Sequence, residues 1–216
     1  MSLEALTELL ESSKQQLESD EKELSVKDKK TGIYLALRRK NFNDENEEKR
    51  FFKAVERIIR GSIEYREWVS FVKDTLQLDV CAFTGETDEE TRDIEIHHHP
   101  FTLYDLVQMV TDTYIMNDKE FCSFDIAQEV LDLHYKLKVG FVPLLRSLHK
   151  KFHNGFLDIP IELVHGDYEY LKKHYFIRPE TLEKVEKYEK IKLEHVGLYN
   201  WAKDRYNVNE SKEGNE

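Results

Sequence analysis

Three consecutive histidines, His97, His98 and His99, follow a stretch in which apolar and polar residues alternate. A second pair, His149 and His153, stands about fifty residues further on with a four-residue spacing. On a helix this spacing puts both imidazoles on one face, where they can share a metal ion. Neutral imidazole is the commonest metal ligand and a common general base near neutral pH. Together, a metal ion and a base are what hydrolysis of a phosphodiester bond requires.

Two other interpretations of these histidines stay open. The side chains could be incidental, exposed on a strand and on an amphipathic helix. They could also close a structural zinc site made of four histidines, although structural zinc is usually bound by cysteine. Cys81 and Cys122 form no C-x-x-C pair, and Cys81 is expected to be a buried, small apolar residue.

The elements that must position the histidines follow from the local pattern. Asp93 to His98 alternates as a strand does, and Phe141 to Leu144 predicts a second short strand. A helix carrying Ser147 to His153 follows and ends at Asn154-Gly155. Each histidine group is therefore expected at one end of a regular element.

Helices are predicted on both sides of the two strands. Thr102 should cap a helix that reaches about Val110, and Ser123 should cap a second one through Leu137. Upstream, an apolar stripe predicts one helix, which Gly61 should end. Ser62 should then cap a second helix, from Ile63 to Leu76. The stripe consists of Phe51, Phe52, Val55, Ile58 and Ile59.

The flanks complete the expected organisation of the chain. Residues 1–30 carry leucines at a seven-residue spacing, a pattern that leaves a coiled-coil dimer open beside a docked or frayed terminal helix. Pro179 predicts the start of a long helix from about Glu180 to Tyr206. The regions are a helical one at 1–76, a core at 77–160 with a helical insertion at 102–138, a helical one at 161–207 and a disordered tail at 208–216.

Composition limits the class of protein. A 40% hydrophobic content with twelve Phe and eleven Tyr is typical of a globular chain. No run of about twenty apolar residues could span a membrane, and no signal-peptide pattern opens the sequence, so a cytoplasmic protein is expected. The net charge of −11 argues against tight nonspecific coating of DNA.

Positive charge is nevertheless concentrated near the second histidine pair. Arg146, Lys150 and Lys151 lie in a segment without acidic residues between Val139 and Leu157. A phosphate backbone would have to lie there if the site cuts DNA, although a solvated helix face explains the lysines equally well. The acidic turn from Glu86 to Glu95 would repel DNA and could instead attract a basic protein partner.

Four segments taken in order resemble an HNH nuclease, most closely the HNH proteins that phages carry. They are Cys81–Gly85, Ile94–His98, Val142–Leu144 and His149–His153. The resemblance covers about residues 79–160 and implies an α+β protein, mostly helical, around a small ββα-metal core. It implies that His97, His149 and His153 bind one divalent metal ion (Mg, Mn, Ni or Zn) and that His98 is the general base. The pair His98/His99 remains an alternative to His97/His98.

This chain differs from the family pattern in two places. The family's middle Asn would fall nine residues before His149, where this chain has Gly140, and His134 is a conceivable substitute. About forty residues separate the histidine run from Gly140, so the helices that begin at Thr102 and Ser123 must be an insertion between the strands. The first hypothesis is a metal-dependent DNA endonuclease. The second is a degenerate, phage-encoded HNH scaffold that binds a protein or a nucleic acid.

Overall fold

The computed structural model describes residues 42, 44–88 and 93–193, and these form a mostly helical protein with one two-stranded antiparallel sheet. The elements in chain order are α2 (Glu45–Gly61), α3 (Ile63–Ser70), the π-helical turn η2 (Phe71–Thr75), β1 (Ile94–His98), α5 (Leu103–Met116), α6 (Ser123–Tyr135), β2 (Phe141–Leu145), α7 (Arg146–His153), the 3-10 turn η3 (Ile161–Leu163), α8 (Glu169–His174) and α9 (Pro179–Tyr188). The predicted α+β class is confirmed. The heptad pattern of residues 1–30 and the tail from residue 208 lie outside the described residues.

Each of the two helices before the sheet begins at a capping residue, and the cap at Ser62 is the one that the sequence predicts. Asp44 caps α2 by accepting the Glu47 N–H at 2.8 Å, and Ser62 caps α3 by accepting the Tyr65 N–H at 3.0 Å. The predicted apolar stripe of α2 is buried except for Ile58, which is half-buried. The helical run expected to Leu76 is therefore confirmed, with its last turn relaxed into η2.

Helices α5 and α6 form the insertion between the strands, as predicted. Thr102 and Asp105 make the expected capping box, and α5 continues past Val110 to Met116. The cap of α6 was expected at Ser123, but the structure places it at Cys122. Asp125 explains the shift, because its carboxylate accepts the Cys122 N–H at 2.7 Å while Ser123 is buried in the first turn.

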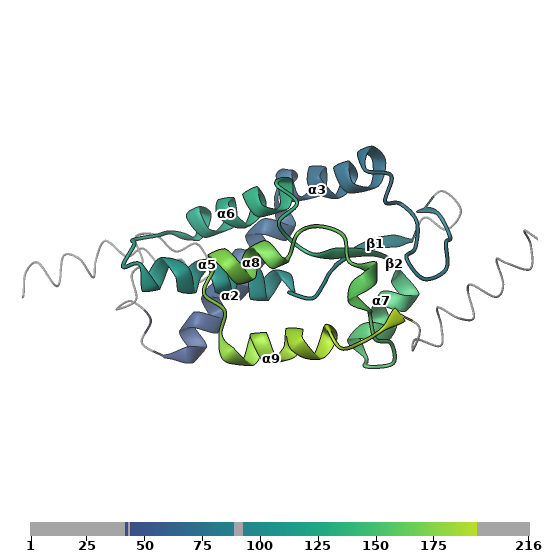
Figure 1. Ribbon diagram of the computed structural model, residues 1–216. Helices are drawn as coiled ribbons and strands as arrows, with labels where there is room; N and C mark the ends of the chain where they lie inside the picture. The colour runs from purple at the N-terminus through teal and green to yellow at the C-terminus, as the bar shows by residue number, and fades with distance from the viewer. Residues whose placement is uncertain (1–41, 43, 89–92, 194–216) are drawn as a thin grey trace, which may run out of the picture.

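Strands β1 and β2 pair in one fixed register, with His97 opposite Val142 and His98 opposite Phe141. Helix α7 follows β2 directly and contacts both strands. Its buried residue Leu148 packs with Val142 and other residues of a small apolar cluster beneath the hairpin. Figure 1 shows β1, β2 and α7 together on the right of the molecule, away from α2, α5 and α6. These three elements make a ββα unit.

The C-terminal helix is shorter than predicted. Pro179 does begin α9, but the helix ends at Tyr188 rather than near Tyr206. After it, the Ile191 N–H donates to the Tyr188 carbonyl at 3.0 Å, and Ile191 packs against the apolar cluster under the hairpin. The chain thus leaves the helix after Tyr188, and Ile191 packs, partly buried, in this cluster. No helix among the described residues is long and apolar enough to cross a membrane.

Gly140 lies where the backbone entering β2 passes the backbone leaving β1. The His99 N–H donates to the Gly140 carbonyl at 3.0 Å. A Cβ atom at position 140 would stand 2.1 Å from the His99 carbonyl oxygen, far inside contact distance. Glycine is therefore required here by the close approach of two backbones. The Asn that the resemblance would put at this position does not fit.

We expect Gly140→Ala to lower the free energy of unfolding by about 1–3 kcal/mol or more, because the added methyl group must push the two strands apart. The matched control is Gly61→Ala, at a helical position where an added Cβ meets nothing within 4 Å. That variant should be neutral or more stable, since alanine favours a helix over glycine. Urea denaturation measures both, and equal midpoints for the two variants would contradict the packing.

Candidate metal centre

Three imidazoles from distant parts of the chain come together where β1 meets α7. Each of His97, His149 and His153 offers one ring nitrogen, and these three atoms lie within 4.8 Å of one another. His149 and His153 are one helical turn apart on α7, and their Nε2 atoms are 2.8 Å apart. The His97 ring contacts both, with ring centroids 4.7 Å and 5.4 Å away. The structure thus brings together the three residues that the sequence grouped as metal ligands.

Glu95 orients one of these rings. The His149 Nδ1–H donates to the Glu95 carboxylate at 2.6 Å, which leaves the lone pair of His149 on Nε2, toward His153. Burial acts to raise the pKa of Glu95, but the bonds from His149 and Arg146 outweigh it and hold that pKa below its usual value. A carboxylate behind a ligating histidine fixes the ring and raises its basicity. Glu95 therefore belongs to the site, although the sequence analysis assigned it no role.

His97 is the buried member of the cluster. Its side chain is 4% exposed, and its Nε2 atom has no hydrogen-bond partner among the described residues. Burial, together with the nearby His149, lowers the pKa of His97 to about 2, and burial also lowers the pKa of His153. Both rings are consequently neutral at neutral pH, the form that binds a metal ion. A buried ring nitrogen without a hydrogen-bond partner is otherwise costly to maintain.

The donor set fits a borderline divalent cation such as zinc or nickel. Imidazole nitrogens around tetrahedral zinc stand ~2.0–2.1 Å from the ion and therefore ~3.4 Å from one another. The observed Nε2 separation of 2.8 Å on α7 would open slightly, and the other nitrogens would draw in from at most 4.8 Å. Three protein ligands leave one position of a tetrahedron free, which is the arrangement of catalytic rather than structural sites.

His98 lies on the opposite face of β1, in the helical core. Its ring is 5% exposed and contacts Tyr65, Trp68 and His134. The His134 Nδ1–H donates to the Val130 carbonyl at 2.6 Å, so the His98 Nε2–H must donate to the His134 Nε2 at 2.8 Å. Burial and His134 hold the pKa of His98 well below its usual value. The position does not suit the general base that the sequence predicted.

His134 and His99 also take definite places. His134, considered a substitute polar group for the missing Asn, is buried in α6 and binds His98, away from the three-histidine cluster. His99 shares the strand face of His97, with ring centroids 6.1 Å apart, and packs on Phe152 and Tyr188. Its Nε2 has no partner among the described residues either. The alternative pair His98/His99 is thus split between two faces.

The expected phosphate contacts divide into two kinds. Arg146 is engaged by carboxylates, with its Nε 2.8 Å from Glu95 and 3.2 Å from Asp93. Lys150 and Lys151 are exposed on α7 and form no ion pair with a described residue. Arg146 therefore supports the ligand-orienting Glu95, and the two lysines are the free positive charges beside the cluster.

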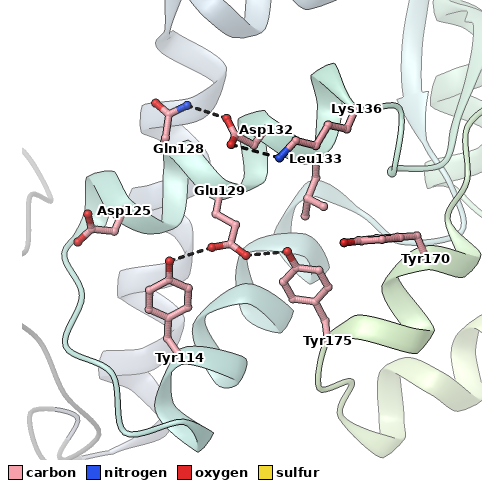
Figure 2. Close-up of a pocket in the computed structure, with 9 residues that line it drawn as sticks. All are labelled: Tyr114, Asp125, Gln128, Glu129, Asp132, Leu133, Lys136, Tyr170 and Tyr175. Carbon is pink, nitrogen blue, oxygen red and sulfur yellow. Dashed lines mark hydrogen bonds and ion pairs between the residues drawn. The ribbon is translucent and has the colours of Figure 1, made fainter.

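A separate cavity of about 470 Å³ shares no residue with the histidine cluster. Figure 2 shows Glu129 at its centre, with the Tyr114 and Tyr175 hydroxyls donating to the two carboxylate oxygens at 2.8 Å and 2.6 Å. Asp132 is engaged by Gln128 and Lys136 in the same way. Each carboxylate that lines this cavity therefore has a hydrogen-bond partner, Asp125 from the Cys122 N–H.

We expect His153→Ala to weaken Zn²⁺ or Ni²⁺ binding at least tenfold, because it removes one of three ligands. His174→Ala is the control, since His174 is an exposed helical histidine whose Nδ1 bonds only the carbonyl one turn before it. Isothermal titration of the metal alone into each protein measures the dissociation constant. Equal affinity for the two variants would remove His153 from the centre.

Glu95→Gln should lower metal affinity by about 10–100-fold, the usual effect of losing a carboxylate behind a ligating histidine. The amide cannot stabilise the His149 ring as a carboxylate does. The matched control is Glu162→Gln, an exposed glutamate in η3. Metal titration measures the affinity of each variant, and thermal denaturation with and without Ni²⁺ measures how far the ion stabilises it. A Glu95→Gln protein with unchanged affinity would show that the ring holds its orientation by packing alone.

Comparison with known proteins gives one family match. The model of the bacteriophage G278-like virion protein family matches residues 2–210, which is nearly the whole chain. A search of curated proteins and a search of solved structures returned no significant match. The family extends over the N-terminal helices, the ββα unit and α9 alike. The chain is therefore phage-encoded and belongs to the bacteriophage G278-like virion protein family.

Proposed function

We propose that this virion protein is a divalent-metal-dependent endonuclease of the HNH type, which hydrolyses phosphodiester bonds in DNA. The observation that carries the proposal is the convergence of His97, His149 and His153 on a ββα unit, with nitrogens within 4.8 Å. The ββα arrangement agrees with the core that the HNH resemblance implies. The virion family is compatible with an enzyme that meets DNA during infection.

The chain's own groups define what the site can do. A bound divalent ion would polarise a phosphate oxygen and activate a water molecule. Glu95 holds His149 in the tautomer that leaves Nε2 free to bind the ion. Phe152 packs against His97 at the edge of the site, with the two ring centroids 4.7 Å apart. Lys150 and Lys151 stand on the exposed side of α7, where they can bind the phosphates that flank the bond.

Two observations favour a second candidate function, a degenerate HNH scaffold that acts as a binding or regulatory module. His98, the expected base, is locked into the core by His134, and Gly140 leaves no room for the family's Asn. On this view the three histidines would hold a metal ion without turnover. The acidic balance of the chain, −11, would then suit a basic protein partner rather than DNA.

A plasmid-nicking assay with Mg²⁺, Mn²⁺, Ni²⁺ or Zn²⁺ separates the two candidates. We expect supercoiled DNA to become open circular with at least one of these ions, and EDTA to stop the reaction. His149→Ala should slow nicking at least 100-fold because the ion is lost, while His174→Ala should not change the rate.

No nicking with any of the four ions, together with a stable protein partner in a pull-down, would favour the binding module. Nicking by His149→Ala at the wild-type rate would exclude the proposed centre altogether. The circular dichroism of each variant, compared with that of the wild type, guards against loss of the fold as the cause.

A further inference from the structure

Phe156 stands out among the apolar side chains of the described residues. It is 80% exposed, more than Met116 at 65% or Phe124 at 49%. Its backbone is nevertheless fixed, because the Phe156 N–H donates to the Lys151 carbonyl and the Gly155 N–H to the Phe152 carbonyl, both at 2.9 Å. Gly155 makes this turn with a φ of +73°, a conformation that suits glycine. The fold thus presents a phenyl ring to solvent from an ordered turn.

The charges around this ring suit an anionic partner. Lys150 and Lys151 are exposed on the last turns of α7, just before Phe156, and the sequence has no carboxylate from Val139 to Leu157. Asp158 is the nearest acidic residue in the chain and is exposed. An exposed aromatic ring in a segment with lysines is the combination with which proteins hold single-stranded nucleic acid, since every base has a π-face on which a ring can stack.

The ring is also close to the three-histidine cluster. His153 is a member of that cluster, and Phe156 stands three positions after it, a span of at most ~11 Å between Cα atoms. Successive nucleotides of one strand rise ~3.4 Å in DNA. A base stacked on Phe156 would therefore lie roughly within three nucleotides of a phosphate held at the cluster.

Resting on the proposed endonuclease function, we propose that Phe156 stacks on a nucleobase of bound DNA, next to the phosphate at the three-histidine cluster. Lys150 and Lys151 bind the phosphate backbone of the DNA, and the Phe156 ring stacks on one base. Stacking on a phenyl ring distinguishes little between bases, so this contact positions the strand without reading its sequence. The favoured ligand is single-stranded or locally opened DNA, in which a base is free to leave its neighbours.

The test measures binding of a fluorescein-labelled, single-stranded DNA 12-mer by anisotropy, in EDTA so that nothing is cleaved. Phe156→Ala should weaken binding about 5- to 150-fold. Phe124→Ala, which removes an exposed phenylalanine from α6, should bind as the wild type does. The salt dependence gives a second readout, because Phe156→Ala should keep the wild-type slope whereas Lys151→Ala should reduce it by about one.

Phe156→Trp should retain affinity within about twofold and show quenching of its fluorescence on binding, beyond any change in the wild type. Wild-type affinity in Phe156→Ala, no added quenching in Phe156→Trp, or no binding of the 12-mer by the wild-type protein would each overturn the inference. Its failure is distinct from that of the proposed function. If the protein nicks plasmid but Phe156→Ala binds DNA as the wild type does, the proposed function stands and the stacking inference fails. If Phe156→Ala weakens binding but the protein does not nick plasmid, the inference stands and the proposed function fails.

Discussion

The alternation of side chains along β1 is the constraint on which the site depends. His97 and His98 are neighbours, yet a strand sends them to opposite faces. His97 joins His149 and His153 from α7, and His98 enters the helical core, where Trp68, Tyr65 and His134 surround it. The strand therefore couples two layers of the protein, because a shift of one residue would exchange the contents of both faces.

The helical layer accordingly helps to hold β1 in place beneath the three-histidine cluster. The bond from His98 to His134 ties the strand to α6, within the insertion that separates β1 from β2. On the other face, Glu95 ties the same strand to α7 through His149 and Arg146. The two histidines of α7 are consequently presented to His97 at a fixed distance, without any disulfide among the described residues. If the cluster binds a metal ion as proposed, a preformed set of donors of this kind would lose little entropy on binding.

Membership of a virion protein family and a resemblance to a nuclease describe different aspects of one chain. The family match spans residues 2–210, whereas the resemblance covers about residues 79–160. The histidine cluster and Phe156 lie within this shorter part. The N-terminal helices, the insertion and α9 share one apolar core, which contains Phe51, Trp68, Leu106 and Val185. The ββα unit is thus built into a larger helical body.

Much of this organisation could be predicted from the sequence because it depends on local rules. The two strands, the insertion, the Thr102 capping box and the helix with His149 and His153 all follow from periodicity and caps. The cap at Cys122 was not predicted, because the Asp125 carboxylate three residues later accepts the Cys122 N–H. The end of α9 was not predicted either, because Ile191 packs in an apolar cluster far away in the sequence. Glu95 could have been noticed, since it stands two residues before His97 on the same strand face.

Where each imidazole lies was settled only by tertiary structure. The sequence by itself determined that His97, His98 and His99 lie on or beside a strand and that His149 and His153 share a helical face. It could not determine which face of β1 meets α7, because both faces are covered by elements far away in the chain. Packing on Trp68 and His134 removed His98 from the site, and the close approach of His99 to Gly140 excluded an Asn there. Both outcomes arise from long-range contacts, for which no local pattern is a signal.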